Sequence, residues 1–397
     1  MACSRLLRTG SISSIVPSGS EFWYCGKATA QSAIPKSTTG LYNEVVAIKL
    51  HNTLTGSLEE FSPIGQGPVK MYHCGPTAYG TQHIGNLSMF VFTDILRRTL
   101  EYSDLSVKQV INITDFGHLT SDADEGEDKM AKGLRAEGLS PTLENMRTLA
   151  HKYGDIFLED IKKLNVKTDD TIFPYASEYI SDQIMLIKIL NEKGFAYQIS
   201  DGLYFNISTF PKYGRLGGLS ESRTQARVSP NPDKINPQDF VLWKLNKELG
   251  FPSEWGQGFP GWHIECSAMI IKLLGEQIDI HTGGIEHIPV HHNNEIAQSE
   301  AATGKVPFSR FWLHRAHLQV SGDPTSLKLR GARKMAKSEG NVVYLSEIIE
   351  KGFSPIVFRY FLLNSHYRTP TNFTWEALEA AGNAYRKLKE FVSMNKE

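Results

Sequence analysis

The sequence lacks long hydrophobic runs and an excess of charge of either sign. Its longest apolar stretches, near 184–190 and 356–363, are too short and too often interrupted by charge to cross a bilayer, so we expect a protein of an aqueous compartment without a membrane partner. Lys and Arg number 42 against 43 Asp and Glu, which excludes the strong basic field that drives nonspecific nucleic-acid binding. Any contact with RNA must therefore be local. With 397 residues, the chain is long enough for two or three domains.

Cysteine is scarce, with four residues in the chain. Cys3 and Cys25 lie in an N-terminal segment of unusual composition, which leaves Cys74 and Cys266 for the folded body. So small a number argues against a disulfide framework. Two isolated cysteines are explained either as metal ligands or as small, inert core residues.

Acidic residues are almost absent from residues 1–40, which contain only Glu21 beside four basic residues and many Ser and Thr. This leader composition is typical of a transit peptide for a mitochondrion or a plastid. A disordered extension or a misassigned start codon explains it equally well. In those cases we expect the protein in the cytoplasm.

The hydrophobic pattern of residues 44–114 predicts a βαβ unit. The segments 44–54, 68–77 and 107–114 are apolar, β-rich runs, and residues 87–102 have the apolar period of a helix. A strand, a helix and a strand within about 45 residues indicate a parallel sheet with a right-handed crossover.

The middle of the chain predicts an insertion into that sheet. Asp201-Gly202 stands between two alternating runs and predicts a β-hairpin, hence a small antiparallel domain. The parallel pattern then resumes with a strand at 277–281, so the two halves of the sheet lie far apart in the sequence. Helices are predicted at about 141–164, 178–193, from 262, at 293–302, 346–351, 354–363 and 374–395.

Four side chains make a candidate metal site. His291 and Glu295 are spaced i, i+4, which places both on one face of a helix start. Cys74 ends a predicted strand and Cys266 lies at the start of a predicted helix. If the two half-sheets meet, two thiolates, an imidazole and a carboxylate form a tetrahedral set for Zn²⁺. Each residue alone is more often structural than ligating.

Two polar segments are candidates for nucleotide binding. His83-Ile84-Gly85-Asn86 lies at the mouth of a predicted helix, where a glycine and two polar side chains suit a phosphate. Lys334 and Lys337 lie in KMAKS, within a loop rich in Gly, Arg and Lys, where they can neutralise a triphosphate. KMAKS alone is equally well explained as a solvated charge patch. No Walker loop and no G-x-G-x-x-G is present, which disfavours the common nucleotide folds.

HIGN and KMAKS resemble the HIGH and KMSKS signatures of class I aminoacyl-tRNA synthetases. The fuller set, MYHCGPT, NITD, PGWHIECSAM, DIHTGG, HHNNEIAQSEA and KMAKSEGN, resembles cysteinyl-tRNA synthetases from about Tyr42 to Ala381. The resemblance implies an α/β fold: a Rossmann-type parallel sheet, split by an inserted α+β connective domain and followed by a helical C-terminal segment. The implied division is leader 1–40, first half of the catalytic domain 41–160, connective domain 161–255, second half 256–315, KMSKS-loop (stem-contact) domain 316–370 and the start of a helical bundle at 371–397.

The resemblance also implies the chemistry, which is protein biosynthesis by a cysteine–tRNA ligase. Such an enzyme is expected to form cysteinyl-adenylate from L-cysteine and ATP with Mg²⁺, to select the substrate thiolate on one Zn²⁺ and to charge tRNA(Cys), as a monomer. The implied zinc ligands are Cys74, Cys266, His291 and Glu295. Gly75, Thr114 and Trp262 match cysteine-binding positions, and His83, Asn86, Gly283, Gly284, Glu286 and Lys337 match ATP-binding positions. The implied catalytic residues are His83, Asn86, Lys334 and Lys337.

The chain departs from the family pattern at several positions. Asn86 replaces the last His of HIGH, Ser88 stands where an arginine is common, and Gly80 stands where an acid is frequent. Glu286 replaces an Asp and Ala336 a Ser, and the stretch before KMAKS is longer than usual. The chain stops at Glu397, where family members continue into a helical bundle and an anticodon-binding domain, so we expect tRNA recognition to be reduced.

Two other functions fit parts of the pattern. A ligase that transfers activated cysteine to an amino sugar shares the catalytic core and needs no anticodon domain. A non-catalytic paralogue that binds cysteine, zinc or RNA would explain the changes at Ser88, Gly80 and Glu286. The retention of all four candidate ligands and of Lys334 and Lys337 argues against the non-catalytic paralogue. The motifs resemble those of the synthetases more closely than those of the amino-sugar ligases, which favours the tRNA ligase.

Overall fold

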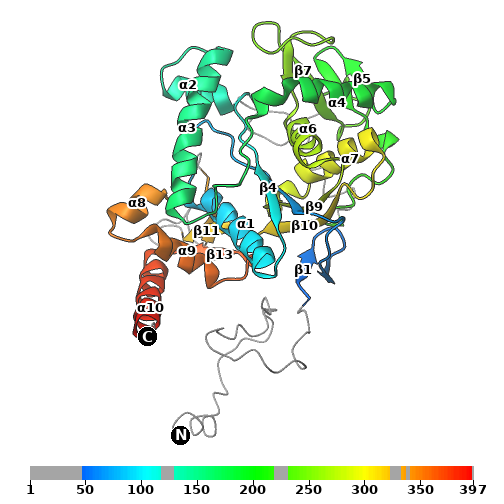
Figure 1. Cartoon of the computed structure of the whole chain (residues 1–397). Coiled ribbons are helices and arrows are strands. Elements are labelled where there is room, and N and C mark those ends of the chain that lie inside the picture. The colour runs from blue at the N-terminus through cyan, green and yellow to red at the C-terminus, as the bar shows by residue number, and fades with distance from the viewer. Residues whose placement is uncertain (1–46, 118–128, 219–230, 322–331, 337–339, 396–397) are drawn as a thin grey trace. The chain divides into compact units, whose positions relative to one another are not determined.

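The computed structural model describes residues 47–117, 129–218, 231–321, 332–336 and 340–395 (Figure 1). Its centre is a parallel sheet with the strand order β10–β9–β3–β4. This sheet joins two segments that more than 160 residues separate, as the sequence predicted. The strands are β3 (Val69–His73), β4 (Val107–Ile111), β9 (Ile278–Gly284) and β10 (Ser309–Arg315).

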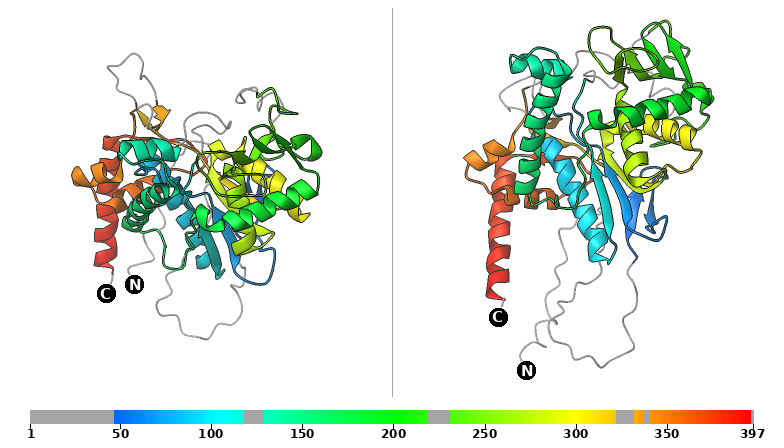
Figure 2. Two further views of the ribbon diagram at one scale, coloured as in Figure 1. Left: turned by 90° about the horizontal axis from the view of Figure 1, so that it is seen from above. Right: turned by 45° about the horizontal axis from the view of Figure 1, so that its top comes forward.

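Helices α1 and α7 flank this sheet. α1 (Ile84–Tyr102) connects β3 to β4, and α7 (His291–Thr303) connects β9 to β10. Right-handed crossovers that run outward in opposite directions place their helices on opposite faces of the sheet (Figures 1 and 2). Both helices begin just beyond the carboxyl ends of strands, which is where doubly wound sheets form their binding sites.

α7 has an unusual composition for a buried helix. Its sequence is HHNNEIAQSEAAT, yet every residue from His291 to Ala302 is buried. The large majority of buried polar groups in proteins have hydrogen-bond partners, since an unpaired one costs free energy. α7 packs against α6 (Trp262–Leu274), in which His263, Glu265 and Ser267 are also buried. Ser267 contacts Gln298 and Ser299 of α7, whereas Glu265 contacts Thr114 on the other side of α6.

A second, antiparallel sheet has the order β5–β6–β7–β8. Its first two strands form the predicted hairpin, in which Ile199 pairs with Gly202. Its apolar face shares one core cluster with Ile264 of α6 and Ala297 of α7, so this insertion supports the helices that carry the polar faces. The elements are β5 (Ala196–Ile199), β6 (Gly202–Phe205), β7 (Phe240–Leu245) and β8 (Gly258–Pro260), with α2 (Lys129–Ala136), α3 (Leu143–Lys163) and α4 (Ile180–Glu192) before them.

Among its described residues, the C-terminal part contains a small sheet and three helices. The sheet has the order β12–β11–β13, and α9 packs against both α1 and α10. Near the start of the described chain, β1 (Lys49–Asn52) and β2 (Ser57–Glu60) form a hairpin. The C-terminal elements are β11 (Leu318–Ser321), β12 (Ala332–Lys334), α8 (Leu345–Glu350), α9 (Pro355–Leu363), β13 (Thr371–Phe373) and α10 (Trp375–Met394).

The expected fold class is confirmed: a split parallel sheet, an inserted antiparallel sheet and C-terminal helices. Strand β10 was not predicted from the sequence because six of its seven residues are buried, which removes the alternation that marks a half-buried strand.

The domain boundaries stay predictions. The leader, the acidic run 122–128, Lys337 and most of the stretch before KMAKS lie outside the described residues. No helix of the described residues is long and apolar enough to span a membrane.

Candidate active site

A cavity of about 830 Å³ opens beyond the carboxyl ends of β3 and β9. It brings together residues that the sequence analysis selected from both half-sheets and from KMAKS. The predicted residues that line it are Cys74, Gly75, Asn86, Trp262, Gly284, Glu286 and Lys334. The other predicted residues within the described chain, His83, Thr114, Cys266, Gly283, His291 and Glu295, are buried.

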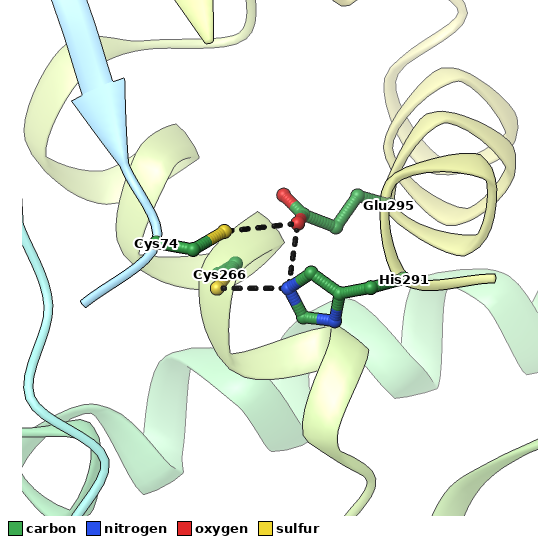
Figure 3. Close-up of side chains that lie close together, drawn as sticks. All are labelled: Cys74, Cys266, His291 and Glu295. Carbon is green, nitrogen blue, oxygen red and sulfur yellow. Dashed lines mark hydrogen bonds and ion pairs between the residues drawn. The ribbon is translucent and has the colours of Figure 1, made fainter. Parts of the chain in front are cut away.

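The four candidate metal ligands meet at one place (Figure 3). Their donor atoms all lie within 4.8 Å of one another. His291 Nε2 is 2.9 Å from Glu295 Oε1 and 3.7 Å from Cys266 Sγ. Cys74 Sγ is 3.7 Å from the same carboxylate oxygen. Cys74 follows β3, Cys266 comes from α6, and His291 and Glu295 share one face of the start of α7.

These separations fit one zinc ion. Four donors in a tetrahedron, with metal bonds of about 2.0–2.3 Å, lie roughly 3–4 Å apart. Two sulfurs, one imidazole and one carboxylate are a donor set that zinc prefers, whereas magnesium and calcium prefer oxygen alone. All four side chains are buried, and Cys74 is the most exposed at 8%.

The ligand side chains lie so close together that they shift one another's pKa. Burial raises the pKa of Glu295, but His281 and His291 outweigh it and hold this pKa well below its usual range. Burial lowers the pKa of His291, but Glu295 and Cys266 raise it overall, to about 10. Burial also raises the pKa of the Cys74 thiol. A metal ion must therefore displace protons from His291 and Cys74 at neutral pH.

A shell of further histidines surrounds the group, and the sequence analysis missed it. His263 Nδ1 lies 2.7 Å from His291 Nδ1, and His281 Nε2 lies 2.9 Å from Glu295 Oε2. Such outer partners fix the orientation of metal ligands. A clue was available, because seven of the 13 histidines in the chain lie between 263 and 317.

A second donor set overlaps with the first. Cys74 and Glu295 also lie within 4.8 Å of ring nitrogens of His281 and His292. His292 Nε2 is 3.4 Å from Cys74 Sγ, and its Nδ1 is 2.7 Å from His314 Nε2. The set with both cysteines is the better zinc site, because it supplies two thiolates and thus more charge and softness.

The start of α1 forms another wall of the cavity. His83 is its N-cap, and His83 Nδ1 accepts the N–H of Asn86 at 3.2 Å. Asn86 Nδ2 donates to Gln82 Oε1 at 2.6 Å. The remaining N–H groups and the positive end of the helix dipole suit an anion.

KMAKS packs directly on this helix start. A Cβ at Gly85 would crowd the His83 ring and would lie 3.4 Å from Met335 Sδ. Glycine at this position therefore allows the close approach of Met335. The N–H of Ile84 also donates to the carbonyl of Val343 at 2.9 Å. The two signature segments are thus neighbours in space, although about 250 residues separate them.

Glu286 connects the end of β9 to KMAKS. Its carboxylate oxygens lie 3.5 Å from Lys334 Nζ and 3.5 Å from His317 Nδ1. Burial raises its pKa, but His287, Lys334 and His317 outweigh burial, so this pKa is lowered overall. The carboxylate folds back over Gly284, where an added Cβ would overlap it. Glu286 is therefore an anion that pairs with the first lysine of KMAKS.

The part of the cavity beside Cys74 is built from close main-chain contacts. The N–H of Gly75 donates to Asn112 Oδ1 at 2.8 Å, and a Cβ at Gly75 would overlap the main-chain carbonyl of Asn112. The hydroxyl of Thr114 donates to Glu265 Oε2 at 2.8 Å. The N–H of Thr114 also donates to the carbonyl of Pro76 at 3.0 Å. Gly75 and Thr114 thus join the segments that follow β3 and β4 next to Cys74, and Thr114 also joins them to α6.

Trp262 covers the candidate metal group. Its ring centroid is 4.2 Å from that of His291, and Lys129 Nζ lies 5.2 Å from the Trp262 ring centroid. Lys129 is the first residue of α2 and lines the cavity. The sequence analysis missed Lys129 because this residue lies in none of the motifs that were selected.

The fold and the cavity define the class of protein. The methionyl-tRNA synthetase of Mycobacterium tuberculosis, solved with methionyl-adenylate, aligns with a TM-score of 0.58 over 79% of this chain and 68% of its own, at 14% identity. At that identity the likeness shows the fold alone. Residues 60–383 match the family described as tRNA synthetases class I (C) catalytic domain. The chain thus has the catalytic domain of a class I tRNA synthetase.

More similar relatives narrow this class. The chain is 46% identical to the cysteine–tRNA ligase of Treponema denticola, over 88% of this chain and 69% of the relative. It is 44% identical to cysteine–tRNA ligase 1 of Burkholderia lata, over 86% and 71%, and 42% identical to the cysteine–tRNA ligase of Chlorobaculum tepidum, over 87% and 69%. The chain belongs to the cysteine–tRNA ligase family, which confirms the resemblance seen in the sequence.

Proposed function

We propose that this chain activates L-cysteine with ATP, selects it by a zinc–thiolate bond and transfers it to tRNA(Cys). The observation that best supports the proposal is the buried group of Cys74, Cys266, His291 and Glu295 at the base of a cavity that the start of α1 and Lys334 also line. A soft metal site and an anion site on one cavity suit a substrate with a thiol and a triphosphate.

The four side chains would hold Zn²⁺, which when bound offers a coordination position that favours sulfur over the oxygen of serine. Cys74 lies at the cavity wall, whereas Cys266, His291 and Glu295 lie behind it. Gly75 and Thr114 would frame the amino acid from one side, and Trp262 would exclude water from the other. Selection by one bond that the competitor cannot form makes a separate editing site unnecessary.

The opposite part of the cavity would bind ATP with Mg²⁺. Gly283, Gly284 and Glu286 would contact adenosine, and His83 and Asn86 the phosphates. A carboxylate oxygen of cysteine attacks the α-phosphorus in line, and the bond to pyrophosphate breaks. The N-terminus of α1 and the lysines Lys334 and Lys337 would stabilise the negative charge that develops.

The second step needs only a hydroxyl of the terminal ribose of tRNA. That hydroxyl attacks the carbonyl carbon of the adenylate, and AMP leaves. With a net charge of −1, the chain would contact tRNA through local patches rather than a general basic field. We propose a monomer that works in the cytoplasm or, if the leader is a transit peptide, in an organelle.

Cysteine-dependent ATP–pyrophosphate exchange on purified, zinc-loaded protein tests the proposal. We expect exchange with cysteine, none above background with serine, and a loss of at least about 100-fold in Cys266→Ser, because that change removes a soft ligand. Circular dichroism checks that the variant is folded. No exchange from folded, zinc-loaded wild-type protein would overturn the proposal. Charging of tRNA(Cys), compared with transfer to an amino sugar, then identifies the acceptor.

A further inference from the structure

A buried arginine lies beside the nucleotide part of the cavity and has no acidic partner in the part of the chain that the structure describes. Arg315 is the last residue of β10 and is 3% exposed. Its Nε donates to Ser88 Oγ at 3.1 Å, and its Nη2 is buried without a hydrogen-bond partner among the residues that the structure describes. Burial lowers the pKa of Arg315 to about 10, so the guanidinium is still charged at neutral pH.

Other buried arginines of this chain are paired with acids. Arg97 lies 2.5 Å from Asp170, and Arg359 lies 2.5 Å from Asp94. A buried charge without a counter-ion is strongly unfavourable, and a fold keeps such a group only where the surroundings or a ligand compensate for it. The acidic partners of Arg97 and Arg359 explain why these charges can be buried. The buried charge of Arg315 therefore needs another explanation.

The position of Arg315 indicates which ligand would compensate. Arg315 is in register with Gly284 of β9, which lines the cavity. The hydroxyl of Ser88 that it contacts donates in turn to the carbonyl of Gly85, at 2.7 Å, in the first turn of α1. A cation next to a helix N-terminus is unfavourable, because the helix dipole is positive there. It becomes favourable once an anion binds at that terminus.

We propose that Arg315 is a positioning residue for ATP, whose guanidinium, held by Ser88 beside the first turn of α1, adds positive charge where the phosphates bind. This inference rests on the proposed function and deepens it. It also accounts for Ser88, which stands where the resemblance described above implies an arginine: the charge comes from the end of β10 instead of from α1. A motif search would not select Arg315, because it lies outside HIGN and KMAKS.

Binding of the non-hydrolysable analogue α,β-methylene-ATP to the zinc-loaded full chain tests this inference by calorimetry. We expect Arg315→Met to weaken binding about tenfold or more, because it removes one charge near three phosphates in a partly desolvated site. Arg310→Met is the matched control, since Arg310 lies on the same strand at the end away from the cavity. It should change the affinity by less than about twofold.

Two further variants separate charge from packing. Ser88→Arg combined with Arg315→Ser returns the guanidinium to α1, and we expect it to recover most of the affinity. Ser88→Ala removes the contact to Arg315 together with the hydrogen bond to the Gly85 carbonyl, and it should weaken binding by about two- to fivefold. This variant remains informative if Arg315→Met does not fold. Unchanged affinity in Ser88→Ala and in folded Arg315→Met would overturn this inference alone. If the wild-type protein does not bind the analogue, both the proposed function and this inference fail.

Discussion

Buried Glu295 remains charged because two histidines lie next to its carboxylate. His281 Nε2 and His291 Nε2 are each 2.9 Å from one of its oxygens, and together they lower its pKa in spite of burial. Glu295 and its two histidines thus compensate one another, so that removal of one leaves a partner buried and unpaired. A change in the size or charge of a single residue should therefore disturb the geometry of the site.

Gly75 is the residue for which size is most restricted. A Cβ there would overlap the main-chain carbonyl of Asn112, so we expect Gly75→Ala to push β3 and β4 apart beside Cys74. The expected cost is about 1–3 kcal/mol or more in the free energy of unfolding, together with loss of cysteine-dependent exchange. Gly65→Ala is the matched control, because nothing lies within 4 Å of the added Cβ there. Equal stability and activity of the two variants would contradict this account.

At the scale of elements, the sequence predicted those whose pattern is local. The period of 87–102 predicted α1 and Asp201-Gly202 predicted the β5–β6 hairpin, because each depends on neighbours in sequence. β10 and the short strands of the small sheet were missed, since their burial is decided by tertiary contacts. Likewise, i, i+4 spacing placed His291 and Glu295 together, whereas His263, Lys129 and Arg315 come from separate elements and only folding brings them to the site.

The contact between α9 and α1 should contribute to the stability of the fold. Arg359 of α9 lies 2.5 Å from Asp94 of α1 and donates to the carbonyl of Leu164 at 3.1 Å. Asp94 is 1% exposed, so Arg359→Met would leave it with Arg98 as its remaining cationic partner. We expect a loss of about 3 kcal/mol or more in the free energy of unfolding, measured by urea denaturation.

The control for Arg359 is an exposed ion pair. Lys188 and Glu254 lie 3.4 Å apart, with side chains 45% and 47% exposed. Lys188→Met should change the free energy of unfolding by less than about 1 kcal/mol, because solvent screens such pairs. If the two variants lose equal stability, α9 is not anchored to α1 through Arg359, and the C-terminal elements are held by apolar packing alone.

For the whole molecule, the candidate metal site joins segments that are distant in sequence. Cys74 follows β3, whereas His291 lies 217 residues later, at the start of α7. Cys266 belongs to α6, which also packs on the inserted antiparallel sheet. One ion bound by all four side chains would therefore cross-link the two half-sheets and the insertion. Because an unfolded chain does not present this site, the free energy of metal binding adds to that of folding.

We therefore expect zinc to raise the melting temperature of the metal-depleted protein. A free concentration of about 100 times the dissociation constant should stabilise the fold by about 2.7 kcal/mol. Mg²⁺ serves as the control ion, since it prefers oxygen ligands and should have no effect. Cys266→Ser should reduce the shift with zinc, because it removes one of the two sulfur ligands.

The stabilisation by zinc should also depend on pH, with a sign fixed by the protons that the site carries. The pKa of His291 is raised to about 10 and that of Cys74 is raised by burial, so both groups are protonated at neutral pH and must lose their protons when zinc binds. Raising the pH lowers the cost of that loss, and zinc affinity should rise about tenfold per pH unit for each proton released. Competition with a chelator at about pH 6.5 and about pH 8.5 measures this slope. An affinity that is independent of pH, or a melting shift that Cys266→Ser leaves intact, would show that zinc binds elsewhere.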